Sequence, residues 1–292
     1  MHKAGFVNII GDPNVGKSTL MNALIGEKIS IITPKAQTTR HRIMGLLNGD
    51  DYQVVFSDTP GVLKPGYKLQ QYMMRFVRSA LDDADLFIVL TDLQKDFDHP
   101  HILKQIKDSG IPVLLLINKV DLGTQDQVVY KSEQWKKNFP DWLVLPISAL
   151  VGFNLDQVFD KILELLPESP PFFPKDDLTD KPMRFFVAEM VREKILMNYQ
   201  QEIPYSVEVI VESYKDEGNL VRIRCVIHVA RESQKGIIIG QQGKMLKKIG
   251  TLARKEMETF IGKKVFLELH VKVSKNWRES ESHLKRFGYL DQ

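Results

Sequence analysis

The stretch Gly11-Asp12-Pro13-Asn14-Val15-Gly16-Lys17-Ser18 decides how this chain folds, because it matches the pattern G-x-x-x-x-G-K-[ST]. An apolar run typical of a buried strand, 5–10, precedes it, and a helical pattern, 17–25, follows it and stops at Gly26. Between a strand and a helix, such a loop binds phosphate through its backbone N–H groups and the helix N-terminus. Lys17 can reach the β and γ phosphates of a nucleotide, and Ser18 can ligate Mg²⁺. The predicted phosphate contacts are therefore residues 11–18 together with Thr19.

The rest of the N-terminal half alternates between two kinds of pattern. Runs typical of strands lie at 52–56, 86–90, 113–117 and 142–147, and helical patterns lie at 68–81, 99–108, 127–138 and 154–166. Alternation of this kind indicates a mainly parallel sheet covered by helices on both faces. We therefore expect an α/β P-loop domain over residues 1–167.

Two later motifs select the base of the nucleotide. The run Asn118-Lys119-Val120-Asp121 ends an apolar strand, at the edge where α/β sheets bind ligands. Asp121 can accept hydrogen bonds from N1–H and N2–H₂ of guanine, which adenine lacks, and leaving a buried carboxylate unpaired costs about 1–3 kcal/mol. The backbone of Ser148-Ala149 can donate to the guanine O6. The predicted guanine contacts are Asn118, Lys119, Asp121, Ser148 and Ala149.

Between these motifs lie the residues expected to respond to the γ-phosphate. Asp58-Thr59-Pro60-Gly61 follows a strand, so that Asp58 can hold Mg²⁺ through water and the Gly61 N–H can contact the γ-phosphate. The polar stretch Gln37-Thr38-Thr39-Arg40 suits a switch segment, and we favour Thr39 over Thr38 as its metal-binding hydroxyl. The predicted catalytic residues are Lys17, Thr39, Asp58 and Gly61, and the predicted Mg²⁺ ligands are Ser18, Thr39 and Asp58.

Val62 occupies the position where many small GTPases carry the glutamine that orients the attacking water. Because a valine side chain cannot hydrogen-bond water, we expect GTP hydrolysis by the isolated protein to be slow, or to depend on another group or a cation.

The 292 residues are enough for two domains, and charge and proline mark the boundary. The proline-rich segment 168–182 predicts a linker. Residues 183–292 hold 20 Lys and Arg against 14 Asp and Glu, a net charge of +6, whereas residues 1–182 carry −3. Nine of these basic residues and only three acidic ones fall within 231–264, which favours a polyanion as the partner. A solvated surface is the alternative explanation.

The C-terminal half predicts a small α+β domain over residues 183–292. A helix, 184–196, and strands at 206–212 and 220–229 precede a helix–turn–helix that contains Gly240-Gln241-Gln242-Gly243, and a strand at 264–273 follows. This order is typical of a type II KH domain, whose G-x-x-G turn lets a nucleic-acid backbone approach beside an apolar groove. Since the turn is uncharged, affinity must come from neighbouring cations. The predicted RNA contacts are Arg231, Lys235, Gly240, Gln241, Gln242, Gly243, Lys244, Lys247 and Lys248.

With both halves in view, the chain resembles the Era family of bacterial ribosome-assembly GTPases over essentially its whole length. The resemblance rests on Gly11 to Ser18, Gln37 to His41, Asp58 to Gly61, Asn118 to Asp121, Ser148-Ala149, the linker and Gly240 to Gly243. It implies a GTP-dependent switch that binds small-subunit ribosomal RNA near its 3′ end, assists maturation of the small ribosomal subunit, and leaves after hydrolysis. Many relatives carry arginine where this chain has Asp12.

The resemblance also bears on cofactors and location. Several GTPases with an apolar residue at the position of Val62 use K⁺ held by the asparagine that aligns with Asn14, which implies K⁺ beside Mg²⁺ as a cofactor. A single cysteine, Cys225, favours a reducing compartment, and the apolar runs are shorter than the ~18 residues that cross a bilayer. We expect a cytoplasmic monomer, with a peripheral contact at the inner face of the cytoplasmic membrane implied by the family.

Two rival functions and three isolated side chains complete the alternatives. A P-loop kinase of small molecules would not need the guanine motif, and an RNA-binding protein with an inert nucleotide domain would not need Lys17, Ser18 and Asp58. His99 and His101 lack partners at the spacing of zinc ligands, so we expect them to be solvated. Trp277 could either stack on a base or pack within the C-terminal domain.

Overall fold

The computed structural model describes residues 1–290, and its backbone divides into two compact units. Unit 1 contains Met1–Ser30, Thr39–Lys64 and Met73–Asp180. Unit 2 contains the chain from Lys181 onward together with two short segments of the N-terminal half, Ile31–Thr38 and Pro65–Tyr72. The predicted start of the second domain, residue 183, lies close to Lys181, where the last segment of unit 2 begins. The sequence did not indicate that Ile31–Thr38 and Pro65–Tyr72 would group with the C-terminal half.

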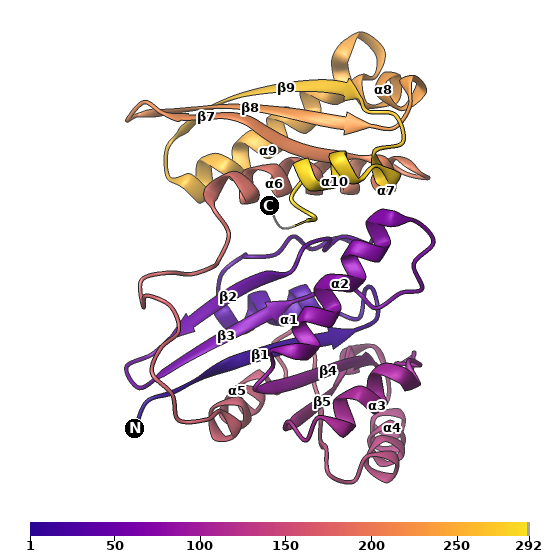
Figure 1. Cartoon of the computed structure of the whole chain (residues 1–292), viewed down its shortest axis with the longest axis vertical. Helices are drawn as coiled ribbons and strands as arrows, with labels where there is room; N and C mark the ends of the chain where they lie inside the picture. The colour runs from indigo at the N-terminus through magenta and orange to yellow at the C-terminus, as the bar shows by residue number, and fades with distance from the viewer. Residues whose placement is uncertain (291–292) are drawn as a thin grey trace. The chain divides into compact units, whose positions relative to one another are not determined.

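Unit 1 is built on a six-stranded sheet in the order β2-β3-β1-β4-β5-β6 (Figure 1). Its strands are β1 (Lys3–Gly11), β2 (Ile43–Asn48), β3 (Tyr52–Asp58), β4 (Leu86–Asp92), β5 (Val113–Asn118) and β6 (Leu143–Pro146). Its helices are α1 (Lys17–Ile25), the part of α2 (Lys68–Asp82) from Met73 onward, α3 (Pro100–Asp108), α4 (Gln125–Asn138) and α5 (Leu155–Leu165), with a single turn of 3₁₀ helix, η1 (Val120–Leu122). The expected α/β domain with a mainly parallel sheet is confirmed.

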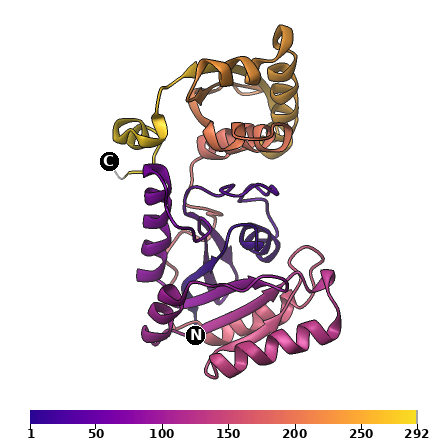
Figure 2. The same cartoon turned by 90° about the vertical axis from the view of Figure 1, so that its right-hand side faces the viewer.

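The parallel strands bring the predicted motifs to one edge of this sheet. Strand β1 lies between β3 and β4, with Ile9 level with Asp58, and β5 pairs with β4 so that Asn118 lies beside Asp92. The inner strands β1, β3, β4 and β5 are largely buried on both faces, because α1 and α5 cover one face while α2 and α3 cover the other (Figures 1 and 2). The carboxyl ends of β1, β3 and β5 therefore present their loops side by side.

Strand β2 was missed in the sequence. It pairs antiparallel with β3 at the edge of the sheet, from Ile43 opposite Asp58 to Asn48 opposite Gln53. Its sequence, Ile43-Met44-Gly45-Leu46-Leu47-Asn48, has neither a strict alternation nor a long apolar run, since Gly45 interrupts it. Gly45 packs closely against α1, because a Cβ there would lie 2.2 Å from Cδ1 of Ile25 and that side chain would have to shift.

The proline-rich segment is fixed against unit 1 rather than loose. Gln53 anchors it, because the Gln53 Oε1 accepts hydrogen bonds from the backbone N–H groups of Phe172 (2.7 Å) and Phe173 (3.0 Å). The Phe172 ring lies 5.0 Å from that of Phe6, and the Leu46 N–H donates to the Leu178 carbonyl at 2.9 Å. The prolines prevent helix formation, so side chains and the edge of the sheet satisfy this backbone instead.

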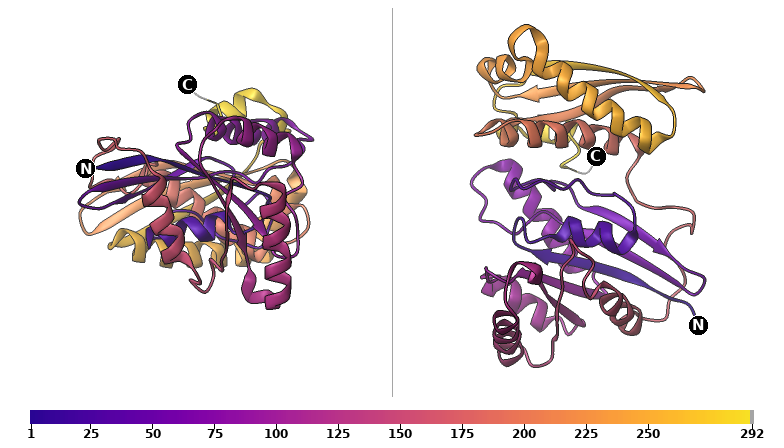
Figure 3. Two further views of the ribbon diagram at one scale, coloured as in Figure 1. Left: turned by 90° about the horizontal axis from the view of Figure 1, so that it is seen from below. Right: turned by 180° about the vertical axis from the view of Figure 1, so that it is seen from behind.

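Unit 2 holds the second sheet, three strands in the order β7-β8-β9. Its strands are β7 (Glu208–Asp216), β8 (Leu220–Val229) and β9 (Lys264–Val273), and its helices are α6 (Met183–Asn198), α7 (Ile203–Ser206), α8 (Glu232–Ile239), α9 (Lys244–Ile261) and α10 (Glu281–Arg286), with 3₁₀ turns η2 (Gln241–Gly243) and η3 (Trp277–Glu279). Strands β7 and β8 are antiparallel, whereas β8 and β9 are parallel and joined by the two helices α8 and α9. Helices α6 and α9 pack on one face of the sheet (Figure 3). This arrangement confirms the predicted KH-type order.

The C-terminal residues, whose structure the sequence did not indicate, pack against this domain. Trp277 is fully buried, and its indole N–H donates to the Ser206 carbonyl at 3.0 Å. Tyr289 donates its hydroxyl to the buried carboxylate of Glu208 at 2.7 Å, and Phe287 lies 4.8 Å from the ring of His228. Of the two alternatives for Trp277, packing is therefore the correct one. Within residues 1–290, no helix combines the length and the apolarity needed to span a membrane.

His228 makes the stability of this packing depend on pH. The side chain is buried, and its Nδ1 lies 2.9 Å from the Ser274 hydroxyl. Burial lowers its pKa to about 4. The nearby positive groups Arg286, Lys272 and His283 add to this shift, and Glu212 opposes it. The unfolded chain, with a pKa of about 6.5, binds a proton here that the folded chain does not, so stability falls as the pH drops from 6.5 towards 4.

We expect this single group to remove about 1–3 kcal/mol of unfolding free energy over that window. Chemical denaturation at pH 7.5 and pH 5.0 measures the effect, with His228→Gln as the variant that cannot titrate. The difference in stability between the two pH values should be smaller in the variant. An identical pH dependence in both proteins would show that His228 does not carry it.

Candidate functional site

The phosphate loop joins β1 to α1, and glycines set its shape. Gly16 has a φ of 104°, and a Cβ there would lie 2.3 Å from the Asn118 Nδ2, so only glycine lets the two segments meet. Gly11 is equally constrained, because its Cβ would lie 2.4 Å from the Leu90 carbonyl oxygen. Lys17 is buried, and its ammonium donates to the carbonyls of Gly11 (3.1 Å) and Asp12 (2.8 Å).

Burial lowers the pKa of Lys17 to about 8, although Asp58 and Asp12 raise it in opposition. An ammonium held in a buried loop at the N-terminus of a helix is suited to a polyanion, since a phosphate would stabilise the charged form. The loop therefore has the geometry and the charge for the predicted phosphate contacts.

Three of the predicted residues meet around the carboxylate of Asp58 at the end of β3. Its Oδ2 accepts hydrogen bonds from the Ser18 hydroxyl at 2.7 Å and from the Thr39 hydroxyl at 3.2 Å, and these two hydroxyls lie 2.9 Å apart. The Asp58 Oδ1 is buried and has no hydrogen-bond partner among the described residues. Burial raises the pKa of Asp58, with Lys17 opposing the rise. A buried carboxylate oxygen beside two hydroxyls is a donor set that fits Mg²⁺.

The neighbouring Thr38 makes different contacts. Its hydroxyl donates to the Lys35 carbonyl at 2.6 Å and lies 2.7 Å from the Thr33 hydroxyl, so it stays within its own segment. Thr39 rather than Thr38 thus lies beside Ser18 and Asp58. The choice of Thr39 stays a prediction for the metal itself, but it has the geometry that the role requires.

The segment after Asp58 lies directly against the phosphate loop. A Cβ on Gly61 would lie 2.5 Å from the backbone nitrogen of Pro13, which requires glycine at this close approach. The Val62 N–H donates to the Gly11 carbonyl at 3.0 Å, and its side chain is buried. Thr59 donates its hydroxyl to the Ile9 carbonyl at 2.8 Å, so both sides of Pro60 are held to β1 or its loop. A buried apolar side chain at residue 62 supplies no hydrogen bond to a water.

Asn118 ties the guanine motif to the phosphate loop. Its Nδ2 donates to the Val15 carbonyl at 2.7 Å, and its Oδ1 accepts from the Ala149 N–H at 2.9 Å. The Lys119 ammonium donates to the Asn14 carbonyl at 2.8 Å. The contact of the Ser148-Ala149 backbone with the guanine O6 stays a prediction, and in the structure the Ala149 N–H donates to Asn118.

Asp121 and Ser148 complete the guanine motif at the same edge of the sheet. Asp121 lies exposed on η1, directly after the strand that ends at Asn118. Ser148 is buried, and its backbone N–H and carbonyl pair with Phe153 at 3.2 and 3.0 Å, so the loop after β6 is closed on itself. The structure thus brings the phosphate, switch and guanine motifs to one edge, as their positions after β1, β3, β5 and β6 require.

In unit 2 the G-x-x-G turn lies between α8 and α9. Three of its four residues have positive φ values, 70° at Gly240, 53° at Gln242 and 74° at Gly243. A Cβ on Gly240 would lie 2.8 Å from the Cβ of Met245, whereas a Cβ on Gly243 would meet nothing. Gly240 is thus required by the turn, and Gly243 leaves open space for a partner.

A cleft of about 400 Å³ adjoins this turn, between α9 and β9. Its lining combines an apolar floor with a cationic rim. The lining residues are Gly243, Leu246, Lys247, Gly250, Thr251, Arg254, Leu267 and Leu269. Of the predicted RNA contacts, Gly243 and Lys247 line the cleft, Arg231 is the N-cap residue of α8, and the others lie on the turn or elsewhere on α8 and α9.

Sequence reasoning missed the groove residues on β9 and the second cation, Arg254. The alternation of Leu267 and Leu269 with exposed neighbours was the available signal for the floor. Arg254 lies within the basic stretch that was recognised, and its position ten residues after Lys244 places it further along the same helix.

Fold and site together define a P-loop guanine-nucleotide-binding protein with a KH domain. A family model described as a 50S ribosome-binding GTPase matches residues 6–119, and a model described as a KH domain matches residues 202–278. The first match covers the phosphate loop and Asp58 to Gly61 and ends within the Asn118 to Asp121 motif, and the second covers the G-x-x-G turn.

Full-length relatives specify the family. GTPase Era of Geotalea daltonii is 47% identical over 289 residues, covering 98% of this chain and 97% of the relative. GTPase Era of Staphylococcus epidermidis is 42% identical over 293 residues, covering 99% and 98%. The chain belongs to the Era family of GTPases, and it is a GTP-hydrolysing enzyme, as the sequence predicted.

Two solved structures share the whole architecture. Era in complex with MgGDPNP and nucleotides 1506–1542 of 16S ribosomal RNA is 40% identical, with a TM-score of 0.95 and complete coverage of both chains. A variant of Aquifex aeolicus Era bound to GDP·AlF4⁻ is 41% identical, with a TM-score of 0.95, covering 99% of this chain and all of the other. The fold of both units is therefore that of Era.

Proposed function

We propose that this protein is a GTP-driven switch that binds the 3′ end of small-subunit ribosomal RNA and assists maturation of the small ribosomal subunit. The observation that carries the proposal is the coexistence, in one Era-family chain, of the Asp58 site and the cleft beside Gly243. The first is suited to a Mg²⁺-bound nucleoside triphosphate, and the second to a single-stranded nucleic acid.

At the nucleotide site we assign the roles as follows. Lys17 and the backbone of 11–18 bind the phosphates, Ser18, Thr39 and Asp58 hold Mg²⁺ directly or through water, and Asp121 selects guanine. Bound Mg²⁺ would neutralise charge that develops on the phosphates during hydrolysis. Gly61 lies against the backbone of Pro13, and we assign to its N–H the contact with the γ-phosphate.

The small subunit is favoured over the large one for a specific reason. The family model whose description mentions the 50S subunit covers only residues 6–119, and thus no part of the KH domain. The relatives that align over the whole chain are Era proteins, and one of them was solved with 16S ribosomal RNA. The RNA-binding half of the chain is the part that should decide the partner.

The groove offers few fixed charges, so binding should respond to single substitutions. Lys247 and Arg254 line it, and Gly243 leaves its turn open. Each cation that contacts a phosphate releases about one counterion on binding, and so steepens the dependence of the affinity on salt concentration. We assign base contacts to the apolar floor and phosphate contacts to the two cations.

The test is to measure binding of a short single-stranded RNA with the sequence of the small-subunit 3′ end. We expect tighter binding with a non-hydrolysable GTP analogue than with GDP, by about tenfold, which corresponds to about 1.4 kcal/mol of coupling. Lys247→Ala and Arg254→Ala should each weaken binding about three- to tenfold and lower the salt slope. Lys161→Ala, an exposed lysine of α5 in unit 1, serves as the control and should not.

Equal RNA affinities with GDP and with the analogue would contradict the switch. Binding that is insensitive to both groove substitutions would contradict the groove assignment, while leaving the nucleotide site intact.

We further propose that K⁺ accelerates hydrolysis through Asn14. Asn14 lies exposed in the phosphate loop with a φ of 64°, and the buried Val62 cannot orient the attacking water. Turnover should be at least about fivefold faster in KCl than in NaCl at equal ionic strength, and Asn14→Ala should abolish that difference. Asn138→Ala, at the exposed end of α4, should preserve it. Equal rates in the two salts would exclude a role for K⁺.

The predicted monomer, the cytoplasmic location and the peripheral membrane contact stay predictions of the family resemblance.

A further inference from the structure

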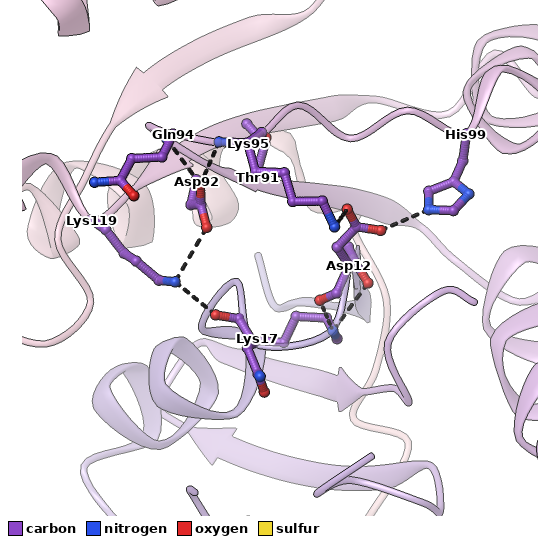
Figure 4. Close-up of polar contacts among 10 residues, drawn as sticks. Asp12, Lys17, Thr91, Asp92, Gln94, Lys95, His99 and Lys119 are labelled. Carbon is purple, nitrogen blue, oxygen red and sulfur yellow. Dashed lines mark hydrogen bonds and ion pairs between the residues drawn. The ribbon is translucent and has the colours of Figure 1, made fainter. Parts of the chain in front are cut away.

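The carboxylate of Asp12 is an unusual group inside the phosphate loop. Its side chain is only 6% exposed, yet two basic groups reach it from the loop between β4 and α3 (Figure 4). The Lys95 ammonium lies 3.0 Å from the Asp12 Oδ2, and the His99 Nε2 lies 2.7 Å from its Oδ1. Neither Lys95 nor His99 belongs to a predicted motif, and His99 is not the solvated side chain that the sequence suggested.

The loop that carries these two residues is itself well ordered by hydrogen bonds. The Asp92 Oδ1 accepts from the backbone N–H groups of Gln94 (3.0 Å) and Lys95 (2.7 Å), and the Thr91 hydroxyl donates to the Lys95 carbonyl at 2.8 Å. The His99 ring lies 4.8 Å from that of Phe97. Lys95 and His99 are thus held where their nitrogens can reach Asp12.

The same loop is tied to a second point of the phosphate loop. The Lys119 ammonium lies 3.2 Å from the Asp92 Oδ2 and also donates to the Asn14 carbonyl at 2.8 Å (Figure 4). The loop after β4 therefore holds residue 12 through Lys95 and His99, and residue 14 through Asp92 and Lys119.

The charge of Asp12 makes these contacts matter for nucleotide binding. A carboxylate in a loop that must accept phosphates repels them unless it is neutralised, and a buried carboxylate without partners is costly. The Asp12 carbonyl also accepts a hydrogen bond from the Lys17 ammonium at 2.8 Å, so the backbone of residue 12 helps to aim the lysine. Neutralising the side chain and fixing the backbone are therefore linked at one residue.

We propose that Lys95 and His99 are positioning residues for the nucleotide: Lys95 neutralises the Asp12 carboxylate, His99 hydrogen-bonds it, and together they fix the backbone that orients Lys17. The inference deepens the proposed nucleotide site and rests on that site binding a guanine nucleotide.

A cycle of variants tests the proposal. Lys95→Met removes the ammonium, and His99→Phe keeps a ring against Phe97 while it removes the nitrogens. The double variant should bind GDP and a non-hydrolysable GTP analogue about tenfold more weakly, and its KM for GTP should rise more than its kcat falls. Adding Asp12→Asn to the double variant should recover most of the affinity, because the uncompensated charge is gone. Lys161→Met, which breaks the exposed pair with Glu164 on α5, is the matched control and should bind like the wild type.

The outcomes are separable. Unchanged affinity in the double variant overturns the proposal, and so does a triple variant that binds as weakly as the double one, because the loop would then act through its fold alone. Thermal unfolding without nucleotide identifies a variant that fails to fold. If the double variant fails to fold, His99→Phe alone should weaken nucleotide binding, and adding Asp12→Asn to it should recover the affinity. Failure of the wild type to bind GDP would instead refute the proposed nucleotide site.

Discussion

The buried carboxylate of Asp58 is the constraint on which the nucleotide half of this protein depends. It is fully buried at the end of β3, it accepts hydrogen bonds from Ser18 and Thr39, and its second oxygen has no partner among the described residues. Burying such a group is unfavourable unless a cation or further donors compensate it. Binding of a cation together with nucleotide phosphates would compensate this buried carboxylate.

Three separate segments must converge for that to happen, and the sheet accounts for the convergence. The phosphate loop follows β1, Asp58 ends the adjacent β3, and Thr39 precedes β2 on the far side of β3. Glycines allow the closest approaches: Gly16 against Asn118, and Gly61 against Pro13. Each of these contacts would be blocked by a single Cβ, so the geometry of the site is sensitive to very small changes at these two glycines.

The KH half uses glycine differently. Gly240 is needed because of its neighbour Met245, whereas Gly243 leaves room for a ligand above the cleft. The floor of that cleft comes from β9, and its cations come from α9. A nucleotide switch in the first half and a nucleic-acid groove in the second are the two parts that an RNA-linked GTPase needs.

Motifs that combine a fixed spacing with a strand end could be predicted from the sequence, because their chemistry needs particular residues at particular places. This was true of residues 11–18, of Asp58 to Gly61 and of Asn118 to Asp121. Features that depend on tertiary contacts could not. The edge strand β2 is interrupted by Gly45, the groove floor belongs to a strand more than twenty residues after the G-x-x-G turn, and the C-terminal residues are held by Trp277. Asp12 is separated from Lys95 and His99 by 83 and 87 positions in the sequence, so no local sequence pattern indicates these contacts.

The measurement that tests the central claim most directly is the Mg²⁺ dependence of nucleotide affinity in Thr39→Ala and Thr38→Ala. If Asp58, Ser18 and Thr39 form the metal site, chelating Mg²⁺ should weaken binding of a non-hydrolysable GTP analogue by tenfold or more in the wild type and in Thr38→Ala, on the order of 1.4 kcal/mol. Thr39→Ala should lose most of that dependence for the triphosphate while keeping it for GDP. A protein whose affinity does not respond to Mg²⁺, or in which Thr38→Ala has the larger effect, would contradict this account.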